Sequence, residues 1–306
     1  MSDEPHPDAQ SFMDERSDAP PLQDISLGML RSQGAPSGAV ESVEETTDVV
    51  VRSNGASIPV RLYTPAGEGP FPVLVWAHGG GSILGDIESE DPTARALTNA
   101  TGCIVASIEY RLAPEHPFPA AFRDFLAVTE WVHDIADEHV DYSGDLLTGG
   151  ASAGGKLAAA TAHYIRDHGG PEIAYQVLIY PSVNYSNDFP SSDEYDGYFL
   201  TNETISWLHE QYLDDPIHGY NPYAFPLEDE DFSDLPPATI VTAGFDPLQD
   251  ACIAYADALA GAGVSVSHHH YEDMIHAFFS KVADPKWDRA HEAMADVGND
   301  IQRYLA

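Results

Sequence analysis

Ser152 stands between small residues in the stretch GASAG at 150–154, which matches the pattern G-x-S-x-G. The short run 145–149, with two leucines, predicts a strand before it, and the alanine-rich run 154–168 predicts a helix after it. In this setting, small neighbours permit a sharp turn that exposes the serine hydroxyl beside the positive end of the helix. Ser152 is therefore a candidate nucleophile; a glycine-rich turn with an unreactive serine is the alternative.

A serine nucleophile needs a general base and an acid that orients the base. Asp246 directly follows the apolar run 238–245, and His276 stands five residues after the predicted strand 263–271. Because the carboxyl ends of parallel strands meet at one edge of a sheet, both side chains should lie near the serine, in the chain order Ser, Asp, His of α/β hydrolases. Asp250 is the competing acid, but it falls one turn into the next predicted helix and should point away from that edge.

Backbone donors for a developing oxyanion are offered by the glycine run that follows the predicted strand 72–77. His78 precedes three glycines, whose lack of side chains lets backbone N–H groups face a substrate oxygen, and the residue after the nucleophile supplies a further N–H. We expect His78 itself to brace this loop. A phosphate-binding loop is the alternative, but no P-loop lysine follows and the overall charge opposes phosphate.

The charge of the chain is extreme. Its 306 residues hold 50 Asp and Glu against 13 Lys and Arg, a formal net charge of −37. Such a surface repels nucleic acid and anionic membranes, and we expect neither as a partner. It also repels itself, and only molar salt, with a Debye length of ~3 Å, screens this repulsion. The composition therefore predicts the high-salt cytoplasm of a halophile; an ordinary acidic mesophile protein is the alternative.

Targeting, redox and metal signals are weak. The N-terminal residues lack a basic segment followed by an apolar one, and no run approaches the ~18 apolar residues of a membrane span, so we expect a soluble, non-exported protein.

Cys103 and Cys252 match no metal or redox spacing and should be buried and reduced. The run 268–270 holds three histidines, but consecutive side chains on a strand face opposite ways, so at most two share a site. We expect no metal and no other cofactor.

The remaining chain alternates predicted strands and helices, which indicates a mostly parallel sheet with helices on both faces. An Asn-Gly turn joins two strands into a hairpin, and continuous apolar runs predict strands buried on both sides. The predicted hairpin strands span 46–53 and 56–65, and the further strands 72–78, 103–110 and 175–181. The predicted helices span 91–102, with Asp91 as N-cap and Gly102 as stop, then 119–137, 248–262 and 286–305.

One segment interrupts this alternation. Residues 183–236 are longer than a connection between a strand and a helix should be, are rich in Tyr, Phe and Pro, and contain a helical pattern near 202–213. Their aromatic content favours an insertion packed over the sheet rather than a disordered acidic loop. The first 45 residues are polar, with one weak amphipathic stretch at 22–32.

Taken together, these motifs resemble the hormone-sensitive-lipase family of carboxylesterases. The resemblance rests on HGGG at 78–81, YRLAPEHPFPAA at 110–121, GASAGG at 150–155, DPLQD at 246–250 and HAF at 276–278. It implies an α/β-hydrolase fold with an eight-stranded, mostly parallel sheet, and a helical cap formed by residues 1–45 and 183–225. The core would then comprise 46–182 and 226–306, and the chain's source would be a haloarchaeon.

The same resemblance implies roles for particular residues. Ser152, Asp246 and His276 would form the catalytic triad, and the oxyanion donors map onto the N–H groups of Gly80, Gly81 and Ala153. The substrate would be a small ester with a short or medium acyl chain, bound by apolar residues of the insertion: Phe199, Leu200, Trp207 and Tyr212. Acidic surroundings should disfavour anionic substrates, although molar salt would screen the effect.

Other functions and several departures from the family stay open. A receptor that binds a small ligand without catalysis, and an amidase or thioesterase with the same triad, are the alternatives, and the chain could form a homodimer. Ala151 replaces the usual Asp or Thr before the nucleophile and removes a side chain that could brace the turn. Lys156 stands where the family has Asn, and Glu90 where it commonly has His.

Overall fold

The computed structural model describes residues 4–32, 39–53, 55–135, 140–283 and 286–306. Within them the chain forms one eight-stranded sheet in the order β1-β2-β4-β3-β5-β6-β7-β8. The pairs β1–β2 and β2–β4 are antiparallel and the others are parallel, which confirms the predicted fold class. The strands are β1 (Glu45–Ser53), β2 (Ala56–Thr64), β3 (Phe71–Ala77), β4 (Ile104–Ile108), β5 (Tyr142–Ala151), β6 (Tyr175–Ile179), β7 (Ala238–Phe245) and β8 (Val266–Ile275).

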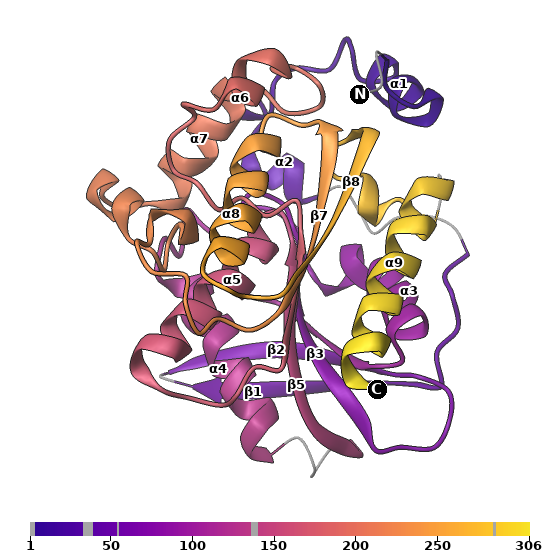
Figure 1. The fold of residues 1–306 in the computed structure, drawn as a ribbon. Coiled ribbons are helices and arrows are strands. Elements are labelled where there is room, and N and C mark those ends of the chain that lie inside the picture. Colours follow the sequence, from indigo (N-terminus) through magenta and orange to yellow (C-terminus); the bar gives the residue numbers. More distant parts are fainter. Residues whose placement is uncertain (1–3, 33–38, 54, 136–139, 284–285) are drawn as a thin grey trace.

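Helices cover both faces of the sheet (Figure 1). One apolar cluster joins the sheet to α4 (Ala120–Ile135), α5 (Ala153–His168) and α8 (Gln249–Gly261). A second cluster joins the opposite face to α3 (Ile87–Thr101) and α9 (Asp288–Leu305). None of the described helices is long and apolar enough to cross a membrane.

Strand β3 shows why a central strand is apolar at every position instead of alternating apolar and polar residues. Val73 and Val75 belong to the cluster with α4 and α5, whereas Leu74 and Trp76 belong to the cluster with α3 and α9. Successive side chains of a strand face opposite sides, so a strand covered on both faces must be apolar at every position. Because β3 and β5 are parallel neighbours, with Ala77 opposite Gly150, their carboxyl ends lie at the same sheet edge.

Among the predicted boundaries that differ from the structure, two bear on the site or on its flanking helix. Asp91 is not an N-cap: α3 begins earlier, at Ile87, because Asp86 and Ser89 cap it reciprocally, and Asp86 accepts the backbone N–H of Ser89 at 2.7 Å. Strand β8 continues to Ile275, so His276 follows the strand directly rather than five residues later.

Other predicted boundaries are confirmed. Gly102 ends α3 in the left-handed conformation, with φ +71°. In the predicted hairpin, Ser53 pairs with Ala56, as a two-residue turn requires, although Asn54 lies outside the described residues, as do positions 136–137 of the predicted helix 119–137.

The insertion is ordered rather than a loose loop. It contains α6 (Pro190–Glu194), α7 (Asn202–Tyr212) and the short 3₁₀ helices Pro216–Tyr220 and Pro226–Glu228. The N-terminal region forms α1 (Pro7–Asp14), a 3₁₀ turn at Leu22–Asp24 and α2 (Leu27–Arg31). The two segments meet, since Thr204 on α7 donates to the Gln23 side chain at 3.2 Å and the rings of Phe12 and Phe199 lie 5.7 Å apart.

Candidate active site

The turn between β5 and α5 holds Ser152 in a strained conformation, with φ +55° and ψ −115°. A residue other than glycine rarely adopts a positive φ, and such strain is typical of a nucleophile elbow. The flanking glycines make the turn possible: a Cβ on Gly154 would lie 2.0 Å from the Ala77 carbonyl oxygen, and one on Gly150 would lie 2.3 Å from the Gly154 carbonyl carbon. The turn is held by the Ser152 N–H, which donates to the Ile179 carbonyl at 2.9 Å.

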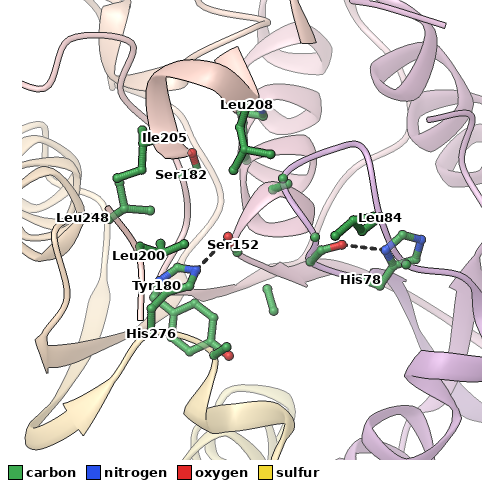
Figure 2. A pocket seen from close by; sticks show the side chains of 18 of the residues that line it. His78, Leu84, Ser152, Tyr180, Ser182, Leu200, Ile205, Leu208, Leu248 and His276 are labelled. Carbon is green, nitrogen blue, oxygen red and sulfur yellow. Dashed lines mark hydrogen bonds between the residues drawn. The ribbon is translucent and has the colours of Figure 1, made fainter. Parts of the chain in front are cut away.

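The structure brings Ser152, His276 and Asp246 into one hydrogen-bonded series, named here the Ser152 chain (Figure 2 shows the first two). His276 Nε2 lies 2.9 Å from Ser152 Oγ, and His276 Nδ1 lies 2.7 Å from Asp246 Oδ2. Asp246 is fully buried, and its other oxygen accepts the Leu248 N–H at 2.9 Å. A carboxylate that accepts from Nδ1–H leaves Nε2 free to accept the serine proton.

The competing acid lies elsewhere. Asp250 accepts the backbone N–H of Ser191 at 2.9 Å, between α8 and α6, and has no contact with His276. The position directly after β7, occupied by Asp246, is therefore the one that reaches the histidine.

Tyr180 is a neighbour of the histidine that sequence reasoning missed. Its ring centroid lies 4.5 Å from that of His276, and its backbone has φ +32°. Tyr180 directly follows β6, as Asp246 follows β7, so its place at the end of an adjacent parallel strand was the available signal. Phe199 covers His276 from the insertion, with 6.5 Å between ring centroids.

The glycine loop after β3 packs against the elbow. Gly80 and Gly81 have φ of +102° and +63°, and a Cβ on either would come within 2.5 Å of the Leu84 carbonyl or the Leu208 side chain. His78 braces the loop as expected: Nδ1 lies 2.7 Å from the Gly79 carbonyl and the ring stacks on Tyr110 at 4.3 Å. Burial lowers the pKa of His78 to about 4, so its imidazole is neutral.

A cavity of about 320 Å³ opens above the serine (Figure 2). Backbone and side chains of the glycine loop, the elbow, the N-terminal region and the insertion contribute to its wall. The lining residues include Leu22, Gly79, Gly80, Gly81, Leu84, Ser152, Ala153, Tyr180, Phe199, Leu200, Ile205, Leu208, Tyr212, Leu248 and His276. This size is typical of a site for a small, mostly apolar ligand.

Three of the four predicted apolar residues of the insertion, Phe199, Leu200 and Tyr212, line the cavity. Trp207 does not, so its prediction was wrong. The cavity face of α7 carries Ile205 and the positions three, four and seven residues later, which share one side of a helix. Trp207 is two residues from Ile205 and therefore faces another side.

Glu90 and Lys156 also line the cavity, and both stand at positions where the chain departs from its resemblance. Glu90 is buried and accepts the Trp76 indole N–H at 2.7 Å, and burial raises its pKa to about 7. Lys156 is 3% exposed, and its Nζ lies 3.4 Å from the Tyr212 ring centroid and 4.8 Å from that of Phe225. Burial lowers the pKa of Lys156 to about 7.

The histidine run on β8 alternates as expected. His268 and His270 both contact Thr242 Oγ1 at 2.8 Å, whereas His269 contacts Asp300 at 2.7 Å from the other face. In the described parts of the chain, no cluster of three or more His, Cys, Asp or Glu side chains is arranged to hold a metal ion.

Comparisons with known proteins agree with this geometry. Residues 74–280 match a family described as alpha/beta hydrolase fold. The chain is 40% identical over 243 residues to the carboxylic ester hydrolase LipN of Mycobacterium tuberculosis, covering 77% of this chain and 65%, just under two thirds, of that protein. It is 38% identical to an arylesterase of Saccharolobus solfataricus, with 78% of each covered.

Solved structures extend the likeness to the whole fold. A hyperthermophilic esterase from the archaeon Pyrobaculum calidifontis superimposes with a TM-score of 0.90 at 32% identity, covering 99% of both chains. Fold and site thus define an alpha/beta hydrolase with a serine elbow. The chain belongs to the alpha/beta hydrolase family that its sequence matches, in keeping with its resemblance to hormone-sensitive-lipase carboxylesterases.

Proposed function

We propose that this protein is a serine carboxylesterase that hydrolyses short- to medium-chain acyl esters through an acyl-enzyme on Ser152. The observation that carries the proposal is the unbroken Ser152 chain at the floor of an apolar cavity. Its relatives are named as ester hydrolases, which supports the same reaction class.

In the first half-reaction, His276 Nε2 takes the Ser152 proton while Oγ attacks the ester carbonyl. The tetrahedral oxyanion is held by backbone N–H groups of Gly80, Gly81 and Ala153, all on the cavity wall. The alcohol leaves with the proton from His276, and Ser152 keeps the acyl group. Water then repeats the steps: it gives a proton to His276, attacks the acyl carbon, and the acid departs as Oγ is reprotonated.

The other groups support these steps. Asp246 fixes the imidazole tautomer and stabilises the imidazolium that forms in each half-reaction. In comparable sites, one oxyanion donor contributes ~10²- to 10³-fold to turnover, so the glycine loop matters nearly as much as the serine. The neutral His78 keeps a positive charge out of this loop and holds its shape.

We propose that residues 1–45 and 183–225 form a cap over the core segments 46–182 and 226–306. Leu22 from the first cap segment and Ile205 from the second line the cavity above the serine. Because the wall is largely apolar and the volume is about 320 Å³, a short or medium acyl chain fits better than a long one.

We also propose that the protein is adapted to high salt, in the cytoplasm of a halophile such as a haloarchaeon. The net charge of −37 supports this, since molar salt screens the repulsion that such a charge creates. A homodimer stays a prediction, which sedimentation in molar salt decides.

Hydrolysis of 4-nitrophenyl acetate, butyrate and octanoate by the wild type and by Ser152→Ala tests the proposal. The assays run in about 3 M KCl and near 0.1 M, where the Debye length rises to ~10 Å. We expect butyrate and acetate to be cleaved faster than octanoate, no cleavage by the variant, and loss of fold and activity at low salt.

Other results would redirect the assignment. Equal background rates for both proteins, with circular dichroism showing an intact fold, would refute the esterase and favour a ligand-binding receptor. Faster turnover of a matched anilide or thioester would favour the amidase or thioesterase. Full activity at 0.1 M KCl would contradict the salt adaptation alone.

A further inference from the structure

Lys156 is a buried ammonium in the cavity wall, one helical turn after Ser152 on α5. Its Nζ contacts aromatic faces, those of Tyr212 and Phe225, at 3.4 Å and 4.8 Å from the ring centroids. Within the described residues, no carboxylate lies within ion-pair distance of it, although the chain has 50 acidic residues. The buried Lys156 ammonium thus has no acidic partner among the described residues.

Burying this ammonium without an anion beside it is unfavourable in free energy. Contact with aromatic faces offsets part of the desolvation of a buried cation, but a paired carboxylate offsets more. Lys156 contacts the Tyr212 ring and its charge acts on His209, both on α7. Glu90 lines the same cavity from α3, where its Oε1 accepts the Trp76 indole N–H. Burial and the charge of Lys156 lower the pKa of His209 to about 3, so it is neutral, and burial keeps the Tyr212 hydroxyl protonated. Among the described residues, no carboxylate acts on the pKa of Lys156, which burial lowers.

A second polar group at this end of the cavity also lacks a partner. The Tyr212 hydroxyl is buried and makes no hydrogen bond to any described residue. An ammonium and a phenolic O–H both donate, and a carboxylate accepts from both kinds of donor. Because the Lys156 ammonium lies over the Tyr212 ring, these two donors are the complement of a single carboxylate.

We propose that Lys156 receives a carboxylate at the far end of the substrate's acyl group, so that the preferred substrates are hemiesters of short dicarboxylic acids. This inference rests on the proposed esterase function. Ser152 and Lys156 both line the cavity of about 320 Å³ at the start of α5, so only a short acyl chain fits between the reacting carbonyl and the ammonium. Surface acidity does not prevent this, because molar salt screens exposed charges far more than buried ones.

The test compares mono-4-nitrophenyl glutarate, which carries the carboxylate, with 4-nitrophenyl pentanoate, which does not. Enzymes are the wild type, Lys156→Met and the control Lys281→Met, in salt at which circular dichroism shows an intact fold. Lys281 is a matched control because its Nζ also lies over a ring, 4.2 Å from the Phe12 centroid, and it is absent from the cavity wall.

We expect wild type and Lys281→Met to show a KM for the glutarate at least tenfold below that for the pentanoate. Lys156→Met should raise the glutarate KM at least tenfold relative to the pentanoate KM, so that the two values become similar, whereas Lys281→Met keeps the wild-type ratio. A carboxylate held away from the reacting bond contributes equally to ground and transition states, so the effect falls on KM. An unchanged glutarate KM in Lys156→Met, with pentanoate still cleaved, would overturn the proposal and leave the esterase function intact.

A binding measurement separates this proposal from the proposed function. Monomethyl glutarate is titrated calorimetrically into Ser152→Ala and into the double variant Ser152→Ala, Lys156→Met. Binding that disappears in the double variant supports the carboxylate site even if no ester is cleaved. Absent or equal binding in both proteins would overturn it.

Discussion

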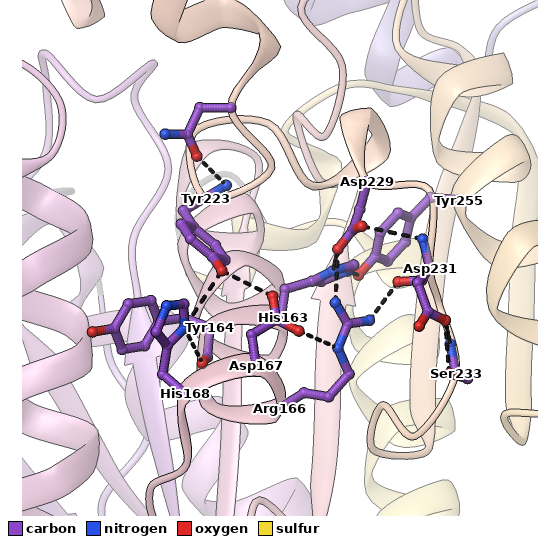
Figure 3. Close-up of polar contacts among 11 residues, drawn as sticks. His163, Tyr164, Arg166, Asp167, His168, Tyr223, Asp229, Asp231, Ser233 and Tyr255 are labelled. Atoms are coloured by element: carbon purple, nitrogen blue, oxygen red, sulfur yellow. Dashed lines mark hydrogen bonds and ion pairs between the residues drawn. The ribbon is translucent and has the colours of Figure 1, made fainter.

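Two hydroxyl–His–Asp series lie at opposite ends of α5, and the one that contains Ser152 borders the cavity described above. The Ser152 chain stands at the N-terminal end of the helix (Figure 2). Near the C-terminal end, His163 Nδ1 lies 2.6 Å from Asp229 and Nε2 lies 3.0 Å from the Tyr255 hydroxyl, a series named here the Tyr255 chain (Figure 3). The hydrogen-bond distances of the two series are nearly the same.

Their surroundings differ. Tyr255 is fully buried, and burial raises its pKa, so its hydroxyl keeps its proton. Asp229 is shared with Arg166, which donates to it at 2.9 Å and also to the Asp231 carbonyl (Figure 3). The Ser152 chain instead meets the cavity and the glycine loop. The proposed function therefore assigns catalysis to the Ser152 chain, because access for a substrate and donors for an oxyanion accompany it.

Replacing the acid of each series gives the largest expected contrast. Asp246→Asn should lower kcat by ~10⁴-fold, because the amide favours the wrong imidazole tautomer, with little change in stability. Asp229→Asn should leave kcat within about threefold and lower the free energy of unfolding by about 2 kcal/mol, since Arg166 and His163 both lose a half-buried charged partner. Ester hydrolysis and urea unfolding, both in molar KCl, measure these effects.

The opposite pattern would contradict this contrast. If Asp229→Asn lost activity while remaining as stable as the wild type, the Tyr255 chain would belong to the catalytic machinery. If Asp246→Asn kept most of its activity, another group would orient the base.

The cations at the two ends of α5 sharpen the same contrast. Lys156 has no acidic partner among the described residues, whereas Arg166 pairs with Asp167 and Asp229 at 2.7 and 2.9 Å. Lys156→Met should raise the free energy of unfolding at pH 7 by on the order of 3 kcal/mol, because it removes a buried, uncompensated charge. Arg166→Met should lower the free energy of unfolding by about 1–2 kcal/mol, because Asp229 loses its ion pair with Arg166.

The pH dependence of the free energy of unfolding tests the prediction made for Lys156→Met. Its pKa is about 7 in the folded protein against 10.5 in the unfolded chain, so the unfolded state binds more protons between these values. Wild-type stability therefore gains from Lys156 as pH rises from 7 toward 10, and the advantage of Lys156→Met should shrink over that range. An advantage that is constant with pH would show that Lys156 keeps its proton in the folded protein as it does in the unfolded chain, or that the gain has another cause.

The fold and the Ser152 chain could be predicted because local signals agreed with one another. Strands buried on both faces leave uninterrupted apolar runs, as in β3, and Ser152 and Asp246 stand directly after such strands. The error at His276 has a physical cause: β8 is an edge strand, and its exposed polar residues conceal where it ends. The N-cap of α3 was wrongly predicted at Asp91 because Asp before Pro is a common helix start, whereas Asp86 and Ser89 form the actual cap.

The cavity wall could be predicted only in part, because the insertion is not anchored to the strand pattern. Which side of α7 faces the serine depends on how the insertion packs, so Trp207 was misassigned and Leu208 was missed. Lys156 was identified as a departure in sequence, but its burial against Tyr212 follows from tertiary packing that no local pattern reports.

The central claim is that Ser152 is the nucleophile, and a covalent probe tests it most directly. Diethyl 4-nitrophenyl phosphate reacts with an activated serine: the Oγ–phosphorus bond forms and 4-nitrophenolate leaves. We predict one diethylphosphoryl group per chain, located by peptide mass spectrometry on Ser152, with ester hydrolysis lost in the same proportion. Continued hydrolysis with Ser152 unmodified, or a label on another residue that tracks the loss of activity, would contradict the account.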